Sequence, residues 1–154
     1  MKNGPESSSI EKNEQNRAQE FINKISDYAR ELLRNEEAGQ LDTEQRIKQL
    51  NPEFGHKARG AAFCFVRAKM FADLEHKCDE VTLGEKNDIS FMSFSEEEKK
   101  LWNDFDLRVL HLSVMYREAY NKILSDQNFD PTMPGWQEIE KPYKEFLKKI
   151  GGVN

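Results

Sequence analysis

Apolar residues recur at steps of three and four along most of this chain, which is the spacing of amphipathic helices. Over residues 10–38 they form a single stripe, which consists of Ala18, Phe21, Ile22, Ile25, Tyr28, Ala29, Leu32 and Leu33. A helix with one apolar stripe lies on the outside of a fold and turns its polar side to water. We therefore predict an outer helix over residues 10–38, with Gly39 as its C-terminal stop.

Two later segments are apolar on two opposite sides. At about 100° per residue, residues 52–78 carry one stripe of Ala61, Phe65, Ala68 and Ala72 and an opposite stripe of Phe63, Val66, Met70 and Leu74. The segment up to residue 125 has a main stripe of Leu101, Phe105, Leu112, Met115, Ala119 and Ile123, and opposite it stand Leu107, Leu110 and Val114. A helix with two apolar sides needs two neighbours. The sequence leaves open whether both neighbours lie within the chain or one is another molecule.

Local signals give the boundaries of these helices. Asp42 with Gln45 three residues later resembles a capping box, which would open a short helix that Asn51 and Pro52 end. Ser93 or Ser95, followed three residues later by a glutamate, predicts the start of the helix that runs to residue 124 or 125. A final helix is predicted near the C-terminus from Pro142 and the spacing of Tyr143, Phe146, Leu147 and Ile150.

The period changes between residues 81 and 94. Val81, Leu83, Ile89 and Phe91 alternate with polar residues around a turn-forming stretch, residues 84–88, which is typical of a small β-hairpin. The alternative is a long loop that places Phe91, Met92 and Phe94 under the bundle. The fold class that follows is all-α: an irregular bundle of four long helices plus one short helix, with the hairpin or the loop between the third and fourth helices.

The remaining segments complete this organisation. Residues 1–9 are polar and contain turn formers, so we expect a disordered tail there. Residues 10–154 then form a single helical domain. A turn-rich connector, residues 130–135, precedes the final helix, and Trp136 and Ile139 are candidates for a separate turn.

The charge of the chain argues against nucleic acid as a partner. The net charge is −5, and charged residues make up 33% of the sequence, so its long-range field disfavours phosphate backbones. The densest group of basic residues is scattered around a helix and forms no single line: His56, Lys57, Arg59, Arg67 and Lys69. We expect no nucleic-acid partner.

We also expect no membrane partner and a cytoplasmic location. The longest apolar run, residues 61–66, is too short to cross a bilayer, and no signal peptide is visible. Cys64 and Cys78 are fourteen residues apart, or about 21 Å along one helix, so they cannot form a disulfide if that helix is continuous. Few cysteines fit a reducing compartment. Secretion without a cleavable signal would leave the same pattern.

No group of residues in the sequence indicates a particular reaction. Glu53 with His56 and Asp73 with His76 each place an acid and an imidazole on one helical face, but about 30 Å of helix separates the pairs. We therefore expect no metal and no cofactor. Neither cysteine has a convincing base beside it. The sequence also contains no Gly-rich phosphate loop and no hydrolase or zinc-protease motif.

Two hypotheses of function remain. The first is a non-catalytic interaction or regulatory protein that binds another protein, or itself, through a helical surface. Its anchors would be Leu107, Leu110 and Val114, with a neighbouring loop contact from Phe91, Met92 and Phe94. The alternative is a small helical enzyme or ligand-binding bundle with a cleft formed by Asp104, Arg108 and His111.

Overall fold

The computed structural model describes residues 4–83, 91–125 and 140–151, with side chains described from residue 17 onward. The α-helices are α1 (Gly4–Arg34), α2 (Glu36–Leu50), α3 (Lys57–Leu83), α4 (Glu96–Ser125) and α6 (Lys141–Lys149). Two short 3-10 turns, η1 (Pro52–Phe54) and η2 (Phe91–Ser93), precede α3 and α4. All regular structure in these ranges is helical, which confirms the all-α class.

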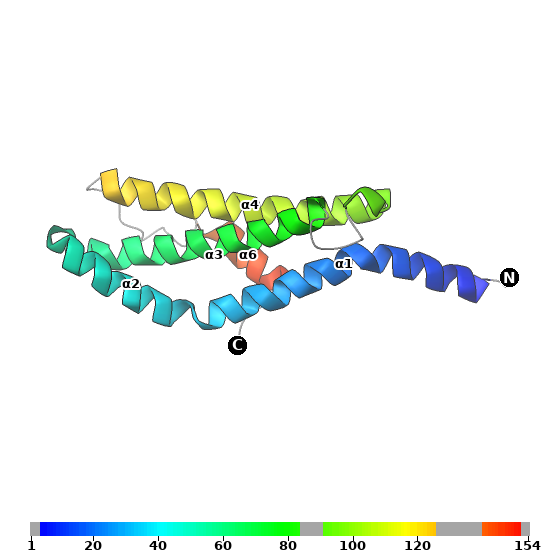
Figure 1. Ribbon diagram of the computed structural model, residues 1–154, viewed down its shortest axis with the longest axis horizontal. Coiled ribbons are helices and arrows are strands. Elements are labelled where there is room, and N and C mark those ends of the chain that lie inside the picture. The colour runs from blue at the N-terminus through cyan, green and yellow to red at the C-terminus, as the bar shows by residue number, and fades with distance from the viewer. Residues whose placement is uncertain (1–3, 84–90, 126–139, 152–154) are drawn as a thin grey trace.

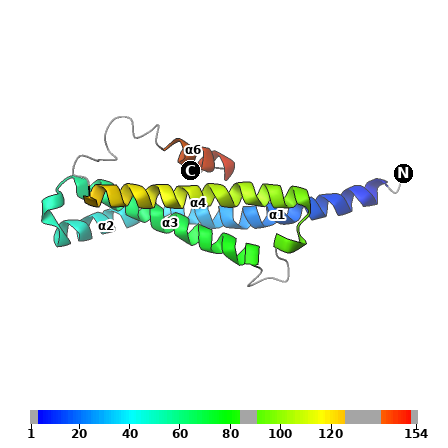
Figure 2. The same cartoon turned by 90° about the horizontal axis from the view of Figure 1, so that it is seen from above.

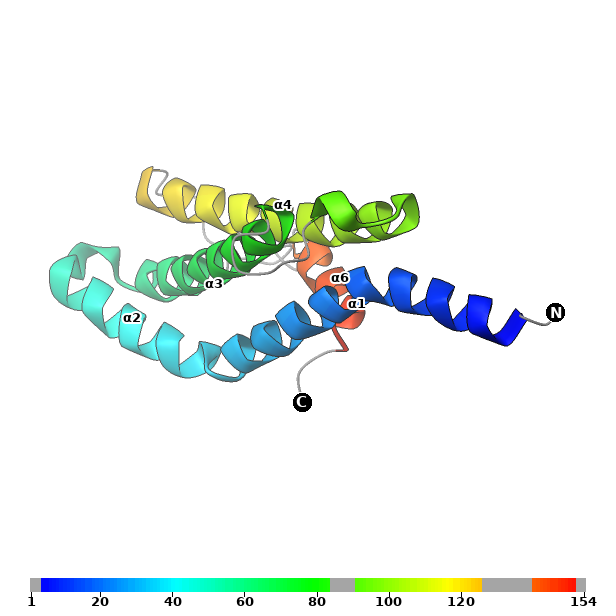
Figure 3. The ribbon, with the colours of Figure 1, turned by 45° about the vertical axis from the view of Figure 1, so that its right-hand side comes forward.

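The helices form an elongated bundle. α1 and α2 follow each other as a bent rod, the chain reverses at η1, and α3 and α4 then run antiparallel along the rod (Figure 1). Figure 3 shows the bend between α1 and α2 most clearly. Figure 2 shows α6 beside α4, on the side away from the C-terminal half of α3. The α3–α4 pair is therefore the centre of the fold, and α1, α2 and α6 pack around it.

The first helix differs from its prediction at both ends. α1 begins at Gly4, within residues 1–9, and ends at Arg34, whereas Gly39 lies inside α2 and is no stop. The last buried residue of the α1 stripe is Leu33, and no side chain of α2 is buried, so the apolar stripe that would keep one helix straight ends there. A Cβ atom built on Gly39 would lie 3.9 Å from Val66 Cγ1, so α2 passes close to α3 at this glycine.

Two predicted helix starts were also placed wrongly. The helix predicted to open at Asp42 begins at Glu36, so Asp42 lies within α2, where its carboxylate lies 3.6 Å from Arg46. Asn51 ends α2, as predicted. α3 begins at Lys57, after the 3-10 turn of η1, rather than at residue 52 or 53.

The predicted β-hairpin is wrong for the residues that the structure describes. Val81 and Leu83 belong to the last turn of α3, and Phe91 lies in η2; Ile89 and the expected turn at 84–88 fall outside the described residues. Leu74, Cys78 and Val81 are spaced by four and three residues and are all buried. The helical period therefore continues past residue 78, because burying Val81 on the same side of α3 favours one more helical turn.

The start of α4 was predicted correctly. Ser95 Oγ accepts a hydrogen bond from the Glu98 backbone N–H at 3.2 Å, and the Glu98 carboxylate accepts one from the Ser95 N–H at 2.8 Å. This pair is a capping box. The Glu98 carboxylate is buried and also accepts bonds from Arg17 Nη2 and the Ala18 N–H of α1. Burial alone raises the pKa of Glu98, but these hydrogen bonds lower the pKa overall, so the cap also fastens α4 to α1.

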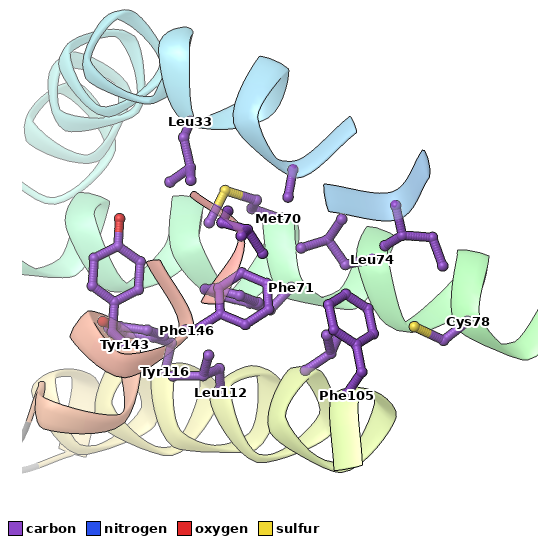
Figure 4. Packing of buried hydrophobic residues seen from close by; sticks show 14 of the residues in the cluster. Leu33, Met70, Phe71, Leu74, Cys78, Phe105, Leu112, Tyr116, Tyr143 and Phe146 are labelled. Atoms are coloured by element: carbon purple, nitrogen blue, oxygen red, sulfur yellow. The ribbon is translucent and has the colours of Figure 1, made fainter. Parts of the chain in front are cut away.

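The core lies between α3 and α4 and is closed by α1 and α6. Figure 4 shows Phe71 of α3 surrounded by Tyr116 of α4 and by Tyr143 and Phe146 of α6. The Phe71 and Phe146 rings meet edge-on with centroids 5.3 Å apart. As the spacing of the final helix predicted, Tyr143 and Phe146 of α6 are buried, and so is Ile150 directly after it.

Candidate docking surface

The second apolar side of α4 faces solvent. Leu107, Leu110 and Val114 are 62%, 38% and 36% exposed. Their spacing of three and four residues places them along one side of the helix, opposite the buried Phe105, Leu112 and Tyr116. The sequence leaves open whether these side chains find neighbours within the chain, and at these exposures the chain covers each of them only in part. Leu107 borders a depression that Pro142 and Glu145 also line, so the last helix reaches the edge of this side of α4 without burying it.

The predicted first stripe of α3 is only partly covered. Ala61 is buried, but Phe65 is 41% exposed and Ala72 is also exposed. Phe65, Ala68 and Ala72 line a groove of about 670 Å³ between α3 and α4. The Phe65 ring contacts Tyr120 of α4 at this groove, with centroids 5.5 Å apart. The opposite stripe of α3 faces the core, where Met70 and Leu74 are buried.

The three residues proposed as a loop contact differ in exposure. Met92 is 79% exposed and Phe91 is half-buried. Phe94 is buried, with its ring centroid 6.2 Å from Phe21 and 6.5 Å from Trp102, so it belongs to the core and not to the surface. Of this set, only Met92 is fully available to a partner. The signal for Phe94 was present in the sequence, because it lies directly before the capping box and packs where the chain enters α4.

The predicted acid, arginine and histidine set does line one pocket. Asp104, Arg108 and His111 border a depression of about 300 Å³ together with Leu107 and, from the last helix, Pro142 and Glu145. Asp104 accepts hydrogen bonds from Lys149 Nζ at 2.7 Å and from Arg108 Nε at 3.2 Å. These bonds, the one from Lys149 foremost, hold the pKa of Asp104 below its usual value. Arg108 also lies 3.8 Å from Glu145. Two of the three residues therefore hold α6 against α4.

Arg67, one of the basic residues scattered around the predicted helix, is buried and joins four parts of the fold. Arg67 Nε donates to Glu36 of α2, and Arg67 Nη1 donates to Tyr116 of α4 and to Glu140, the residue before α6. Its guanidinium also stacks 3.7 Å from the centroid of Tyr143. Arg67 is therefore a structural residue of the core. The sequence contained the signal, because Arg67 precedes Met70, Phe71 and Leu74 by three, four and seven residues, on the same side of α3.

Burial and neighbouring charges together set the protonation states of Arg67 and of the two tyrosines beside it. Burial lowers the pKa of Arg67, but the neighbouring Tyr116 and Glu36 raise it overall, so the guanidinium stays charged. Burial raises the pKa of Tyr116 well above its ordinary value and raises the pKa of Tyr143 to about 12. Both phenols stay neutral at physiological pH. Tyr116 donates its hydroxyl proton to Glu140 at 2.8 Å.

Both cysteines are buried free thiols. Burial raises the pKa of Cys64 to about 12 and also raises the pKa of Cys78, which lies beside the acidic Asp106, Asp79 and Glu75. A thiol is a nucleophile only as the thiolate, so neither cysteine is activated for chemistry.

The described residues contain no group of three or more His, Cys, Asp or Glu side chains placed to share a metal ion. In the same part of the chain, no helix combines the length and the apolar character needed to cross a membrane. Comparisons with family models, with curated proteins and with solved structures found no match to this chain.

Proposed function

We propose that this protein is a non-catalytic interaction or regulatory protein that binds another protein through the exposed side of α4. The observation that carries this proposal is the exposure of Leu107, Leu110 and Val114 on a helix whose opposite side is fully packed. Leucine and valine side chains lined up at three- and four-residue steps are the anchors that a helical recognition surface uses. We define the docking face as these three residues.

The exposed apolar area of the docking face limits the free energy that its burial can contribute to binding. A buried leucine or valine contributes about 1.5–3 kcal/mol relative to an exposed one. The exposed fractions of the three side chains together amount to little more than one whole side chain, so covering them contributes about 2–4 kcal/mol. On its own, that free energy corresponds to a dissociation constant in the millimolar range. A physiological partner must therefore also contact the surroundings of the docking face.

Nearby exposed groups supply such contacts. Leu124 is 48% exposed farther along α4, and Arg117 and Asn121 stand on the same half of the helix as Leu110. Met92 lies before the start of α4, and the eleven residues from Glu96 to Leu107 add about 16 Å of helix. A partner that touches both Met92 and the docking face therefore has to be long. The free, buried thiols support the expected reducing, cytoplasmic setting for this binding.

The substitution Leu110→Asp tests this proposal. Because Leu110 is already 38% exposed, we expect the free energy of unfolding by circular dichroism to stay within about 1 kcal/mol of wild type. Immobilised Leu110→Asp protein should lose the partner that wild type captures from its native cell, because a charge would be buried at the contact. Leu41→Asp is the matched control, since Leu41 is 58% exposed on α2, away from α4, and should retain the partner.

Two outcomes of this experiment would count against the docking face. A loss of several kcal/mol in stability would mean that Leu110 is a core residue. Equal capture by wild type and Leu110→Asp would mean that α4 does not carry the binding.

A second candidate function is a small helical enzyme or ligand-binding bundle, favoured by the single pocket that contains Asp104, Arg108 and His111. Its volume of about 300 Å³ is at the small end for ligand sites. If small carboxylates or phosphates bind there, they should raise the melting temperature of wild type. The exposed His111 would be needed for that rise, so His111→Ala should abolish it. A screen in which no such ligand shifts the wild-type melt would exclude this candidate.

A further inference from the structure

The groove between α3 and α4 has small residues at its middle. Ala68 and Ala72 are one helical turn apart and line the groove of about 670 Å³. Short side chains let another helix approach closely. The groove is therefore shaped for a helix rather than for a compact small molecule.

The charges of the groove are separated along its length. Because α3 and α4 are antiparallel (Figures 1 and 2), Lys69 and Arg117 lie toward the end where Phe65 meets Tyr120. Glu75 and Asp79 line the other end. Within the described ranges, none of these four charged side chains forms a hydrogen bond or an ion pair. The groove thus has an unpaired basic end and an unpaired acidic end.

The acidic end has a third carboxylate from α4. Asp106 is half-buried, and its burial, with the nearby charges of Asp79 and Glu75, raises its pKa. The Cys78 thiol is the hydrogen-bond partner of Asp106, and a thiol does not neutralise a carboxylate. These carboxylates repel one another, and a cation placed beside them would offset that repulsion. His76 also lines the groove, but its imidazole lies 3.6 Å from Glu80.

We propose that the occupant of this groove is a second copy of this chain, related by a two-fold axis that crosses the groove at right angles near Ala72. Lys69 and Glu75 lie three residues to either side of Ala72. A two-fold rotation about that axis reverses the direction of the groove, so the basic end of each copy faces the acidic end of the other. A surface that complements itself in this way is what a two-fold dimer requires. The inference goes beyond the proposed function, because the residues that line the groove are not those of the docking face.

The size of this surface predicts a weak dimer. From Phe65 to Asp79 the groove follows fourteen residues, or about 21 Å of α3. Two helices side by side are about 20 Å wide, so the face measures roughly 400 Å², half of the roughly 800 Å² per partner of a standard interface. We expect dissociation in the micromolar range or weaker, and we expect added salt to weaken the dimer because the paired ends are near water.

Charge reversal tests the inference with two variants that are complements of each other. Lys69→Glu with Arg117→Glu makes both ends of the groove acidic, and Glu75→Lys with Asp79→Lys makes both ends basic. In sedimentation equilibrium, starting from the 18.0 kDa monomer, each variant alone should dimerise at least about tenfold more weakly than wild type. An equimolar mixture should restore association to near the wild-type level, because each acidic end then meets a basic end.

The results separate this inference from the proposed function. If the wild type remains monomeric up to millimolar concentration, the occupant of the groove is not a second copy. The proposal is also wrong if charge reversal does not weaken the dimer, or if mixing the two variants does not restore it. If wild type stays monomeric but captures a native protein through Leu110, the docking face stands and the second copy fails. If the mixture restores the dimer while Leu110→Asp dimerises like wild type and no other protein is captured, the groove stands and the docking face fails.

Discussion

Replacing Arg67 with methionine is expected to lower the free energy of unfolding by about 3–5 kcal/mol, because removing one partner of a buried ion pair leaves the other uncompensated. In this chain it leaves two: Glu36 and Glu140 both lie within 2.5 Å of the guanidinium, and their side chains are mostly buried. Methionine is about as long as the aliphatic part of arginine. The decrease in the free energy of unfolding therefore measures the loss of the charge rather than of side-chain volume. Urea unfolding followed by circular dichroism measures the change.

A matched control and a rescue separate the charge effect from a general effect of substitution. Arg59→Met, at an exposed position of the same helix, should change the stability by less than about 0.5 kcal/mol. Adding Glu36→Gln and Glu140→Gln to Arg67→Met should recover part of the loss, since no buried charge would then remain. If Arg67→Met proves as mild as Arg59→Met, the cluster does not join these helices in solution.

The substitution Phe71→Ala should cost about 3–5 kcal/mol through the cavity it leaves. Phe71 is fully buried, and its ring lies against three aromatic rings, with centroids 6.1 Å away at Tyr116, 6.1 Å at Tyr143 and 5.3 Å at Phe146. Two of those rings belong to α6, so the variant should also loosen that helix. Faster amide hydrogen exchange in residues 141–149 would show the loosening.

Phe65→Ala is the control for Phe71→Ala on the same helix. Phe65 is 41% exposed and its ring contacts that of Tyr120, so its removal should cost about 1 kcal/mol. Both variants should be compared at low protein concentration, where the weak dimer contributes nothing. Equal losses at Phe65 and Phe71 would contradict the placement of the core between α3, α4 and α6.

The sequence predicted what depends on local chemistry and on helical period. The Ser95 and Glu98 capping box, the extent of α4 and the buried side of α6 all follow from residues a few positions apart. The exposed side of α4 was predicted as a second apolar stripe, although only the three-dimensional arrangement could show how much of it remains exposed.

The errors arose where tertiary contacts override local signals. Gly39 is typical of a helix stop, but it lies inside α2, where the backbone faces Val66 of α3. Val81 and Leu83 alternate like a strand, yet Val81 extends the buried side of α3. Arg67 reads as a surface charge because its acidic partners are 31 and 73 positions away. Pairings of that kind depend on which helices become neighbours, and a single sequence does not specify them.

The position of α6 has a consequence for how the chain acquires its structure during synthesis. Phe146 and Tyr143 complete the aromatic group around Phe71, and Arg30 donates to the carbonyl oxygen of Ile150, 120 residues later. The helices made first can pair as they emerge from the ribosome, but their shared interior stays open until residues 140–150 have been translated. Nascent chains therefore carry uncovered aromatic surface from the translation of Phe71 until that of residues 140–150, a period in which chaperones bind such surface.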